Sequence, residues 1–228
     1  MLRTAERWDE IVKAPHIEMP ALPAVEMEFY DFAHWDQLIA GAQKAGPMVL
    51  AAMLLGGDAG LRRGELVALE QADCDAGAVT VRQNEWEGII GTTKGGRFRR
   101  VPMTERLREA IAAVRLLRGK RLLWQPSGRR VKVTTLQSWM ETACRRAGLA
   151  PSRNLHKLRH TFCSHLAMKG APVKVIQELA GHADLKTTMR YMHLAQGSKE
   201  SAIALLEAPA TRCVVGAGVE QQKYEGQK

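Results

Sequence analysis

Four side chains in the stretch 154–193 have the types and order of a phosphate-handling set: His156, Arg159, His182 and Tyr191. A tyrosine hydroxyl is a poor nucleophile at neutral pH because its pKa is about 10. It becomes useful where nearby cations stabilise the developing phenolate and the electrophile is itself anionic. A phosphodiester meets both conditions, so these residue types predict phosphoryl transfer with Tyr191 as the nucleophile.

Cations elsewhere in the chain fit the same chemistry. Planar guanidinium groups match a phosphoryl group in transfer and stay charged at neutral pH, which makes Arg62 and Arg159 candidate clamps. His182 can donate to the same oxygens, and Lys94 can protonate the departing oxygen as a general acid. Each preorganised donor of this kind typically contributes ~10²–10³ in rate. No acidic cluster with metal-ligand spacing accompanies them, so we expect neither a metal nor another cofactor.

The local sequence puts the first two of these residues on one helix. Asn154 is a good N-cap, and leucine and phenylalanine follow it at helical spacing over residues 155–169. His156 and Arg159 are three positions apart and therefore share a helix face. His156 and His160 are four apart and have metal-binding spacing, but no third ligand is placed nearby, and a polar helix residue is the simpler interpretation of His160.

Two shorter helices should bring the other two residues back toward that face. Residues 172–180 read as a helix with Pro172 in its first turn, and Gly181 is its expected C-cap. This cap puts His182 on a loop just past a helix end. A third short helix over residues 185–194 carries Tyr191.

The rest of the chain predicts more helices and a small sheet. Alternating residues between 78 and 103 predict three short strands, with Lys94 at the turn between the second and third. We therefore expect an α+β fold, mainly α-helical, with a small three-stranded antiparallel sheet. The remaining helices are expected to start near these positions: Asp31 (ending near Gly41), Pro47, Gly60, Thr104 and Thr134 or Thr135.

Composition and charge narrow the class of protein. The chain has 228 residues and a net charge of +9, which favours a polyanionic partner, either nucleic acid or an anionic membrane surface. It has no apolar run of the ~18 residues that a membrane span needs, and its N-terminus has no apolar signal region. The cysteines are widely spaced and form no CxxC pair. They fit free thiols in a reducing compartment, so we expect a cytoplasmic location.

Four motifs resemble the tyrosine recombinase family, also called phage-type integrases. Residues 60–66, GLRRGEL, resemble the family's first arginine box, and residues 93–102, TKGGRFRRVP, resemble its β-hairpin lysine segment. Residues 155–162, LHKLRHTF, resemble the HxxR box. Residues 179–193, LAGHADLKTTMRYMH, resemble the box in which a histidine precedes the nucleophilic tyrosine, and this box is the most diagnostic.

The resemblance implies a site-specific DNA recombinase or integrase catalytic domain. It implies cleavage and rejoining of double-stranded DNA through a 3′-phosphotyrosyl intermediate with a free 5′-hydroxyl, without metal or ATP. The implied catalytic set is Arg62, Lys94, His156, Arg159, His182 and the nucleophile Tyr191. Glu65 and His193 are expected to contact and position the catalytic residues without touching the DNA. The cations expected to contact DNA are Arg63, Arg97, Arg99, Arg100 and Lys157.

The resemblance also implies domain boundaries and an oligomeric state. We expect a catalytic domain over residues 29–208, a linker over residues 1–28 and a disordered tail over residues 209–228. Family members usually carry an N-terminal helical domain that closes a clamp around DNA. With only residues 1–28 ahead of the pattern, we expect weak, salt-sensitive DNA binding. The helix expected at 198–207 resembles one that docks on a neighbouring protomer, so we expect a tetramer on DNA and a monomer when free.

Three functions remain open at this point. The first is DNA strand exchange. The second is a type IB-like topoisomerase, which uses the same chemistry without exchanging partners. The third is a DNA-binding regulator that has lost the chemistry, and the intact catalytic set argues against it.

Overall fold

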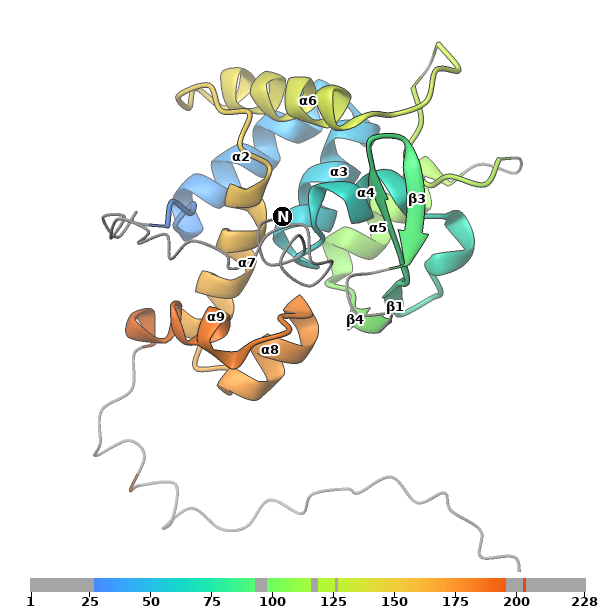
Figure 1. The fold of residues 1–228 in the computed structure, drawn as a ribbon. Helices are drawn as coiled ribbons and strands as arrows, with labels where there is room; N and C mark the ends of the chain where they lie inside the picture. The colour runs from blue at the N-terminus through green and yellow to red at the C-terminus, as the bar shows by residue number, and fades with distance from the viewer. Residues whose placement is uncertain (1–26, 93–97, 116–118, 126, 196–202, 204–228) are drawn as a thin grey trace, which may run out of the picture.

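Helix α3 (Pro47–Gly57) lies at the centre of the larger helical group because its sequence is apolar on every side. The computed structural model describes residues 27–92, 98–115, 119–125, 127–195 and 203. Figure 1 shows helices packed around α3, and the contacts between elements agree. These helices are α2 (Phe32–Ala45), α5 (Glu105–Val114), α6 (Val133–Arg146) and α7 (His156–Met168).

Side-chain caps set where the surrounding helices begin. The Asp31 carboxylate accepts the backbone N–H of His34 at 2.7 Å before α2, and the Thr104 hydroxyl accepts that of Leu107 at 3.4 Å before α5. Both caps were predicted. The predicted end of α2 near Gly41 is wrong, because Gly41 lies in the contact with α6, where its missing side chain lets the two helices approach.

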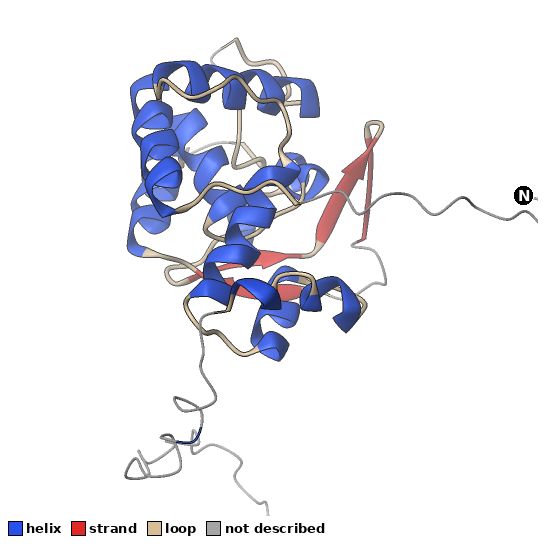
Figure 2. Ribbon diagram, turned by 90° about the vertical axis from the view of Figure 1, so that its left-hand side faces the viewer, coloured by secondary structure: helices blue, strands red, loops and turns tan. Residues whose placement is uncertain are grey.

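The described residues form two antiparallel strand pairs, so the predicted single three-stranded sheet is wrong. Strand β1 (Ala78–Val81) pairs with β4 (Arg99–Pro102), and β2 (Gln83–Trp86) pairs with β3 (Ile89–Thr92). The segment expected as one strand turns back at Glu87 and Gly88, whose φ angles are +49° and +89°. Positive φ at both central residues is typical of a tight hairpin turn. The β2–β3 hairpin projects beside the helices in Figure 2.

A second, smaller helical group packs on the far end of α7. It contains α8 (Val173–Ala180), α9 (Leu185–Met189) and the 3₁₀ turn Met192–Leu194. Its small core is formed by Phe162, Cys163, Ala167, Ile176, Ala180 and Tyr191. The predicted continuous helix over 185–194 is wrong: the Tyr191 N–H bonds to the Thr188 carbonyl, which tightens the chain into a 3₁₀ turn. The tyrosine is therefore at a break between two helical segments.

The main prediction of an α+β, mainly helical fold is confirmed. Within the described residues, no helix is long and apolar enough to cross a membrane. Cys74, Cys144 and Cys163 are buried and free. Lys94, Arg97, the expected tail and, apart from residue 203, the segment expected as a C-terminal helix lie outside the described residues.

The contact between α2 and α6 gives a stability test. A Cβ on Gly41 would lie 2.4 Å from the Ala143 carbonyl oxygen and 2.7 Å from the Ala147 Cβ. Since these are backbone and short side-chain atoms, Gly41→Ala should lower the free energy of unfolding by ~1–3 kcal/mol in urea denaturation. Gly77→Ala is the control, because a Cβ there meets nothing within 4 Å. Equal effects of the two substitutions would contradict the close packing.

Candidate active site

A pocket of about 520 Å³ lies where α7, the loop after α8 and α9 meet the start of α4 (Arg63–Ala68). All the predicted catalytic residues that the structure describes line it: Arg62, His156, Arg159, His182 and Tyr191. Residues far apart in the sequence are thus gathered around one space. Lys94, the remaining member of the predicted set, lies outside the described residues.

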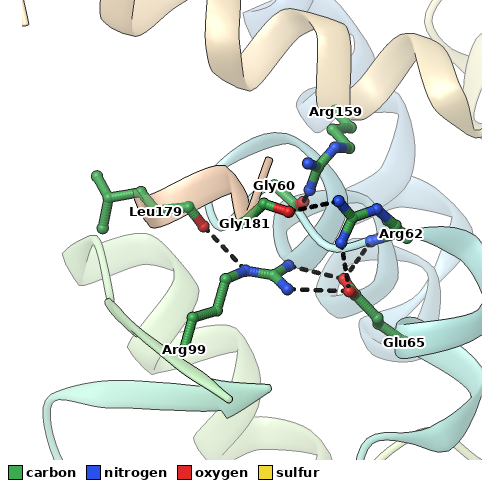
Figure 3. Close-up of polar contacts among 7 residues, drawn as sticks. All are labelled: Gly60, Arg62, Glu65, Arg99, Arg159, Leu179 and Gly181. Atoms are coloured by element: carbon green, nitrogen blue, oxygen red, sulfur yellow. Dashed lines mark hydrogen bonds and ion pairs between the residues drawn. The ribbon is translucent and has the colours of Figure 1, made fainter. Parts of the chain in front are cut away.

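Glu65 holds Arg62 by both its backbone and its side chain. One carboxylate oxygen accepts the Arg62 backbone N–H at 2.7 Å, and the other accepts its Nη1 at 2.8 Å. The Nη2 of Arg62 donates to the carbonyl of Gly181 at 2.7 Å, as Figure 3 shows. Arg62 precedes α4 as its N-cap, so the capping interaction of the helix also orients the guanidinium.

Arg99 in β4 donates two hydrogen bonds to the same carboxylate of Glu65. Its Nη1 and Nη2 donate to the two Glu65 oxygens at 2.9 and 2.7 Å, and its Nε donates to the Leu179 carbonyl at 2.9 Å (Figure 3). The side chain is only 10% exposed, which differs from the surface position expected of a DNA contact. The alternation of side chains along β4 could have indicated this burial, because Arg99 lies on the same face of the strand as the buried Val101.

The two arginines keep Glu65 ionised although it is buried. Burial alone would raise the pKa of this carboxyl, but the hydrogen bonds and charges of Arg99 and Arg62 outweigh it and hold the pKa at about 2, below the ordinary 4.5. The carboxylate therefore carries its negative charge throughout the neutral range.

Arg159 is buried with one donor unused. Its Nη1 donates to the carbonyl of Gly60 at 2.6 Å, while its Nη2 is buried and has no hydrogen-bond partner among the described residues. Gly60 has φ +65°, and a Cβ there would lie 2.5 Å from the ring of Phe162. Burial, and then the charge of Arg62, lower the pKa of Arg159, but a guanidinium stays charged at neutral pH. An unmade hydrogen bond of this kind typically costs about 1–3 kcal/mol, so the pocket favours an anion.

The loop after α8 positions His182 as the sequence predicts. Gly181 ends the helix in the left-handed conformation with φ +67°. The Nδ1 of His182 lies 2.9 Å from the hydroxyl of the buried Thr188, and its ring is parallel to that of Tyr191, with 6.1 Å between centroids. Burial, followed by Arg159 and Arg62, lowers the pKa of His182 to about 3, which leaves the ring neutral.

Tyr191 is 2% exposed, and its hydroxyl contacts His160, for which the sequence predicts only a polar helix position. The hydroxyl oxygen lies 2.7 Å from Nδ1 of His160. Burial, and then the neighbouring Cys163, raise the pKa of the phenol, so it is protonated at neutral pH. The missed signal is spacing: His160 is one turn past His156 and lies on the same face of α7, toward the pocket.

The other predicted residues differ in their surroundings. His156 is exposed on the surface side of the pocket, but partial burial of its ring, and then Arg159, lower its pKa. His193 is exposed and is not among the residues that line the pocket. Lys157 is 19% exposed, with its Nζ 4.4 Å from the Tyr30 ring centroid.

Arg63 and Arg100 are exposed, as expected of DNA contacts. Arg100 pairs with Asp75 at 2.7 Å. Arg63 lies over the ring of Trp86, 5.4 Å from its centroid. Both Arg63 and Trp86 line a second pocket of about 470 Å³ together with Arg130 and Lys132. This second pocket is also lined by Glu85, which pairs with Arg130, and by Glu87, so it keeps only a small excess of positive charge beside an exposed aromatic side chain.

The shifted pKa of Glu65 predicts a dependence of stability on acid. The unfolded carboxyl takes up its proton near pH 4.5 and the folded one near 2, so the free energy of unfolding should fall as the pH drops through this window. The contribution is roughly 3 kcal/mol by the usual conversion. Urea unfolding of Glu65→Gln over the same pH range should lack this part of the slope.

A suitable control is Glu105→Gln, at an exposed ion pair with Arg108. The control should keep the slope of the unchanged chain. If Glu65→Gln keeps the slope as well, the carboxylate does not have the role assigned to it.

The sequence is similar to known recombinases and integrases. The model of the phage integrase family matches residues 29–197. Tyrosine recombinase XerC of Rhodospirillum centenum is 37% identical over 138 residues, covering 58% of this chain and 38% of that protein. A tyrosine recombinase of Thermosipho africanus is 30% identical over 149 residues, covering 65% of this chain and 50% of that protein. This chain thus spans half or less of the length of these relatives.

Solved structures agree with the fold. A Tn1549 transposon integrase in complex with circular intermediate DNA superposes with a TM-score of 0.71 at 21% identity, covering 90% of this chain and 74% of that one. The catalytic domain of bacteriophage HP1 integrase gives a TM-score of 0.59 at 27% identity, covering 82% of this chain and all of that one. Since the family model matches well over half of the sequence, this chain belongs to the phage integrase family.

Proposed function

We propose that this chain is the catalytic domain of a site-specific DNA recombinase that cuts and rejoins double-stranded DNA through a 3′-phosphotyrosyl intermediate. The observation that carries the proposal is the unused Nη2 of Arg159, buried at a pocket that Tyr191 also lines. A phosphate oxygen is an acceptor that matches this donor in charge and geometry. The names of the relatives, and DNA in several of the similar structures, support the same substrate.

Each residue of the pocket has a proposed part in the reaction. The guanidiniums of Arg62 and Arg159 bind the non-bridging oxygens of the scissile phosphate and offset the charge that grows in the transition state. His156 and His182 are neutral at pH 7 and donate hydrogen bonds to the same group. For His182 this requires the proton on Nε2, with Nδ1 accepting from Thr188.

The covalent step exchanges one phosphodiester for another. The Tyr191 oxygen bonds to phosphorus, the bond to the 5′-oxygen breaks, and that oxygen leaves with a proton that we assign to Lys94. Attack by a 5′-hydroxyl on the phosphotyrosine reverses the step. Because one ester replaces another, the exchange needs neither ATP nor a metal.

DNA binding is assigned to the exposed cations around the second pocket. Arg63 and Lys132 lie there with the exposed ring of Trp86, while Arg130 is paired with Glu85. Cations of this kind bind phosphates regardless of sequence, so affinity should fall steeply with salt. Assembly into a tetramer on DNA rests on the resemblance of residues 198–207. A DNA substrate and the buried free thiols fit a cytoplasmic location.

A nicked suicide substrate tests the proposed function. Cleavage near a nick releases a short fragment, so the chain should accumulate as a covalent protein–DNA adduct, visible as a band of lower mobility in a denaturing gel. Tyr191→Phe should form none, because it lacks the attacking oxygen. Absence of adduct with every family-type site tried would count against the proposal. Relaxation of supercoiled plasmid without a specific site would instead favour a topoisomerase.

Arg159 should act on the transition state more than on DNA binding. Arg159→Ala should reduce the rate of adduct formation by at least ~10²-fold, as loss of a preorganised donor typically does, and change the DNA dissociation constant only slightly. Arg108→Ala, at an exposed ion pair on α5, is the control and should change neither. Equal losses of rate and of affinity in Arg159→Ala would contradict a transition-state role.

A further inference from the structure

The proposed catalytic set leaves the proton of the nucleophile without a destination. The phenol of Tyr191 is protonated at neutral pH, so it must lose a proton when its oxygen attacks. In the described part of the chain, the hydroxyl makes a hydrogen bond to Nδ1 of His160 at 2.7 Å, within the usual range for proton transfer. His160 belongs to none of the roles assigned so far.

The other two histidines of the pocket, His156 and His182, make different contacts. His182 uses Nδ1 on Thr188, and its ring lies parallel to Tyr191. His156 meets the ring of His160 edge-on, with 5.5 Å between centroids. Among the described residues, neither makes a hydrogen bond to the tyrosine hydroxyl. Cys163 also interacts with this hydroxyl, but burial raises the pKa of its thiol, so it stays protonated and His160 is the neighbour with a free lone pair.

The charge around His160 sets its resting state. The cations that face it are Arg159 on its own helix and Arg190 at the end of α9, and His156 lies one turn before it. Burial and these neighbours lower the pKa of His160 to about 4, so the imidazole is neutral and Nδ1 can hold a lone pair toward the phenol. A bound phosphate would offset the charge of Arg159. Binding of the substrate therefore favours protonation of His160 at the moment when the phenol ionises.

We propose that His160 is the general base that accepts the proton of Tyr191, an inference that rests on the proposed function. In cleavage, the tyrosine oxygen bonds to phosphorus while its proton moves to Nδ1 of His160. The bond from phosphorus to the 5′-oxygen breaks, and that oxygen takes a proton from the general acid, assigned to Lys94. In rejoining, both protons return.

Two substitutions separate proton transfer from positioning. The side-chain oxygen of asparagine can take the place of Nδ1 and accept the tyrosine hydrogen bond, but it cannot take the proton. His160→Asn and His160→Ala should therefore both slow single-turnover adduct formation on the suicide substrate by at least ~10²-fold. Added imidazole should restore part of the rate to His160→Ala. The control is His34→Asn, an exposed histidine on α2, which should cleave at the unchanged rate.

A sulfur leaving group separates the base from the acid. In a 5′-phosphorothiolate substrate the departing sulfur needs no proton, so cleavage by Lys94→Ala should recover. Cleavage by His160→Ala should stay slow on the same substrate. A His160→Asn variant that cleaves within a few-fold of the unchanged chain would overturn the inference while leaving the proposed function intact.

The protonation state of His160 can be measured without any cleavage of DNA. If the unchanged chain forms no adduct through Tyr191, the proposed function fails, and the state of His160 can still be read by ¹⁵N NMR of its imidazole at pH 7. The inference requires an unprotonated Nδ1 and a proton on Nε2. A proton on Nδ1 would make His160 the donor to the phenol and would overturn the inference.

Discussion

One buried carboxylate makes the arrangement of cations possible. Arg62, Arg99 and Arg159 lie close to one another, and their like charges repel strongly because Arg99 and Arg159 are largely removed from water, although Arg62 remains 34% exposed. Glu65 accepts hydrogen bonds from two of them and is 2% exposed. It also ties the start of α4 to strand β4. The carbonyls of Leu179 and Gly181 accept further hydrogen bonds from Arg99 and Arg62, so the end of α8 is anchored to the same cluster.

This arrangement leaves a surplus of positive charge at the pocket. Glu65 neutralises only part of the charge, and Arg159 keeps a buried N–H that has no partner within the described part of the chain. A site that is unfavourable when empty becomes favourable when an anion enters, which is how binding sites commonly trade stability for function. Burial, and then this surplus of charge, lower the pKa values of the pocket histidines and keep them neutral. The fold therefore holds positive charge at the pocket before a phosphate binds.

Local sequence signals predicted much of the fold and part of the site. The caps at Asp31 and Thr104, and the left-handed Gly181 that presents His182, depend on neighbouring residues and can be read directly. The tight turn at Glu87 was missed because Glu-Gly is a weaker turn signal than Asn-Gly or Asp-Gly, so residues 86–93 read as one strand. The roles of Arg99 and His160 depend on contacts between residues 34 and 31 positions apart, and no local pattern reports such distances. Alternation and helix spacing place both side chains on inward faces but do not name their partners.

The most direct test is a crystal structure of the Tyr191→Phe chain bound to a DNA duplex that carries its recombination site. The account predicts that the scissile phosphate accepts hydrogen bonds from Nη2 of Arg159 and from Arg62, while Arg99 remains on Glu65. A phosphate bound elsewhere, with the Nη2 of Arg159 still unpaired, would contradict it.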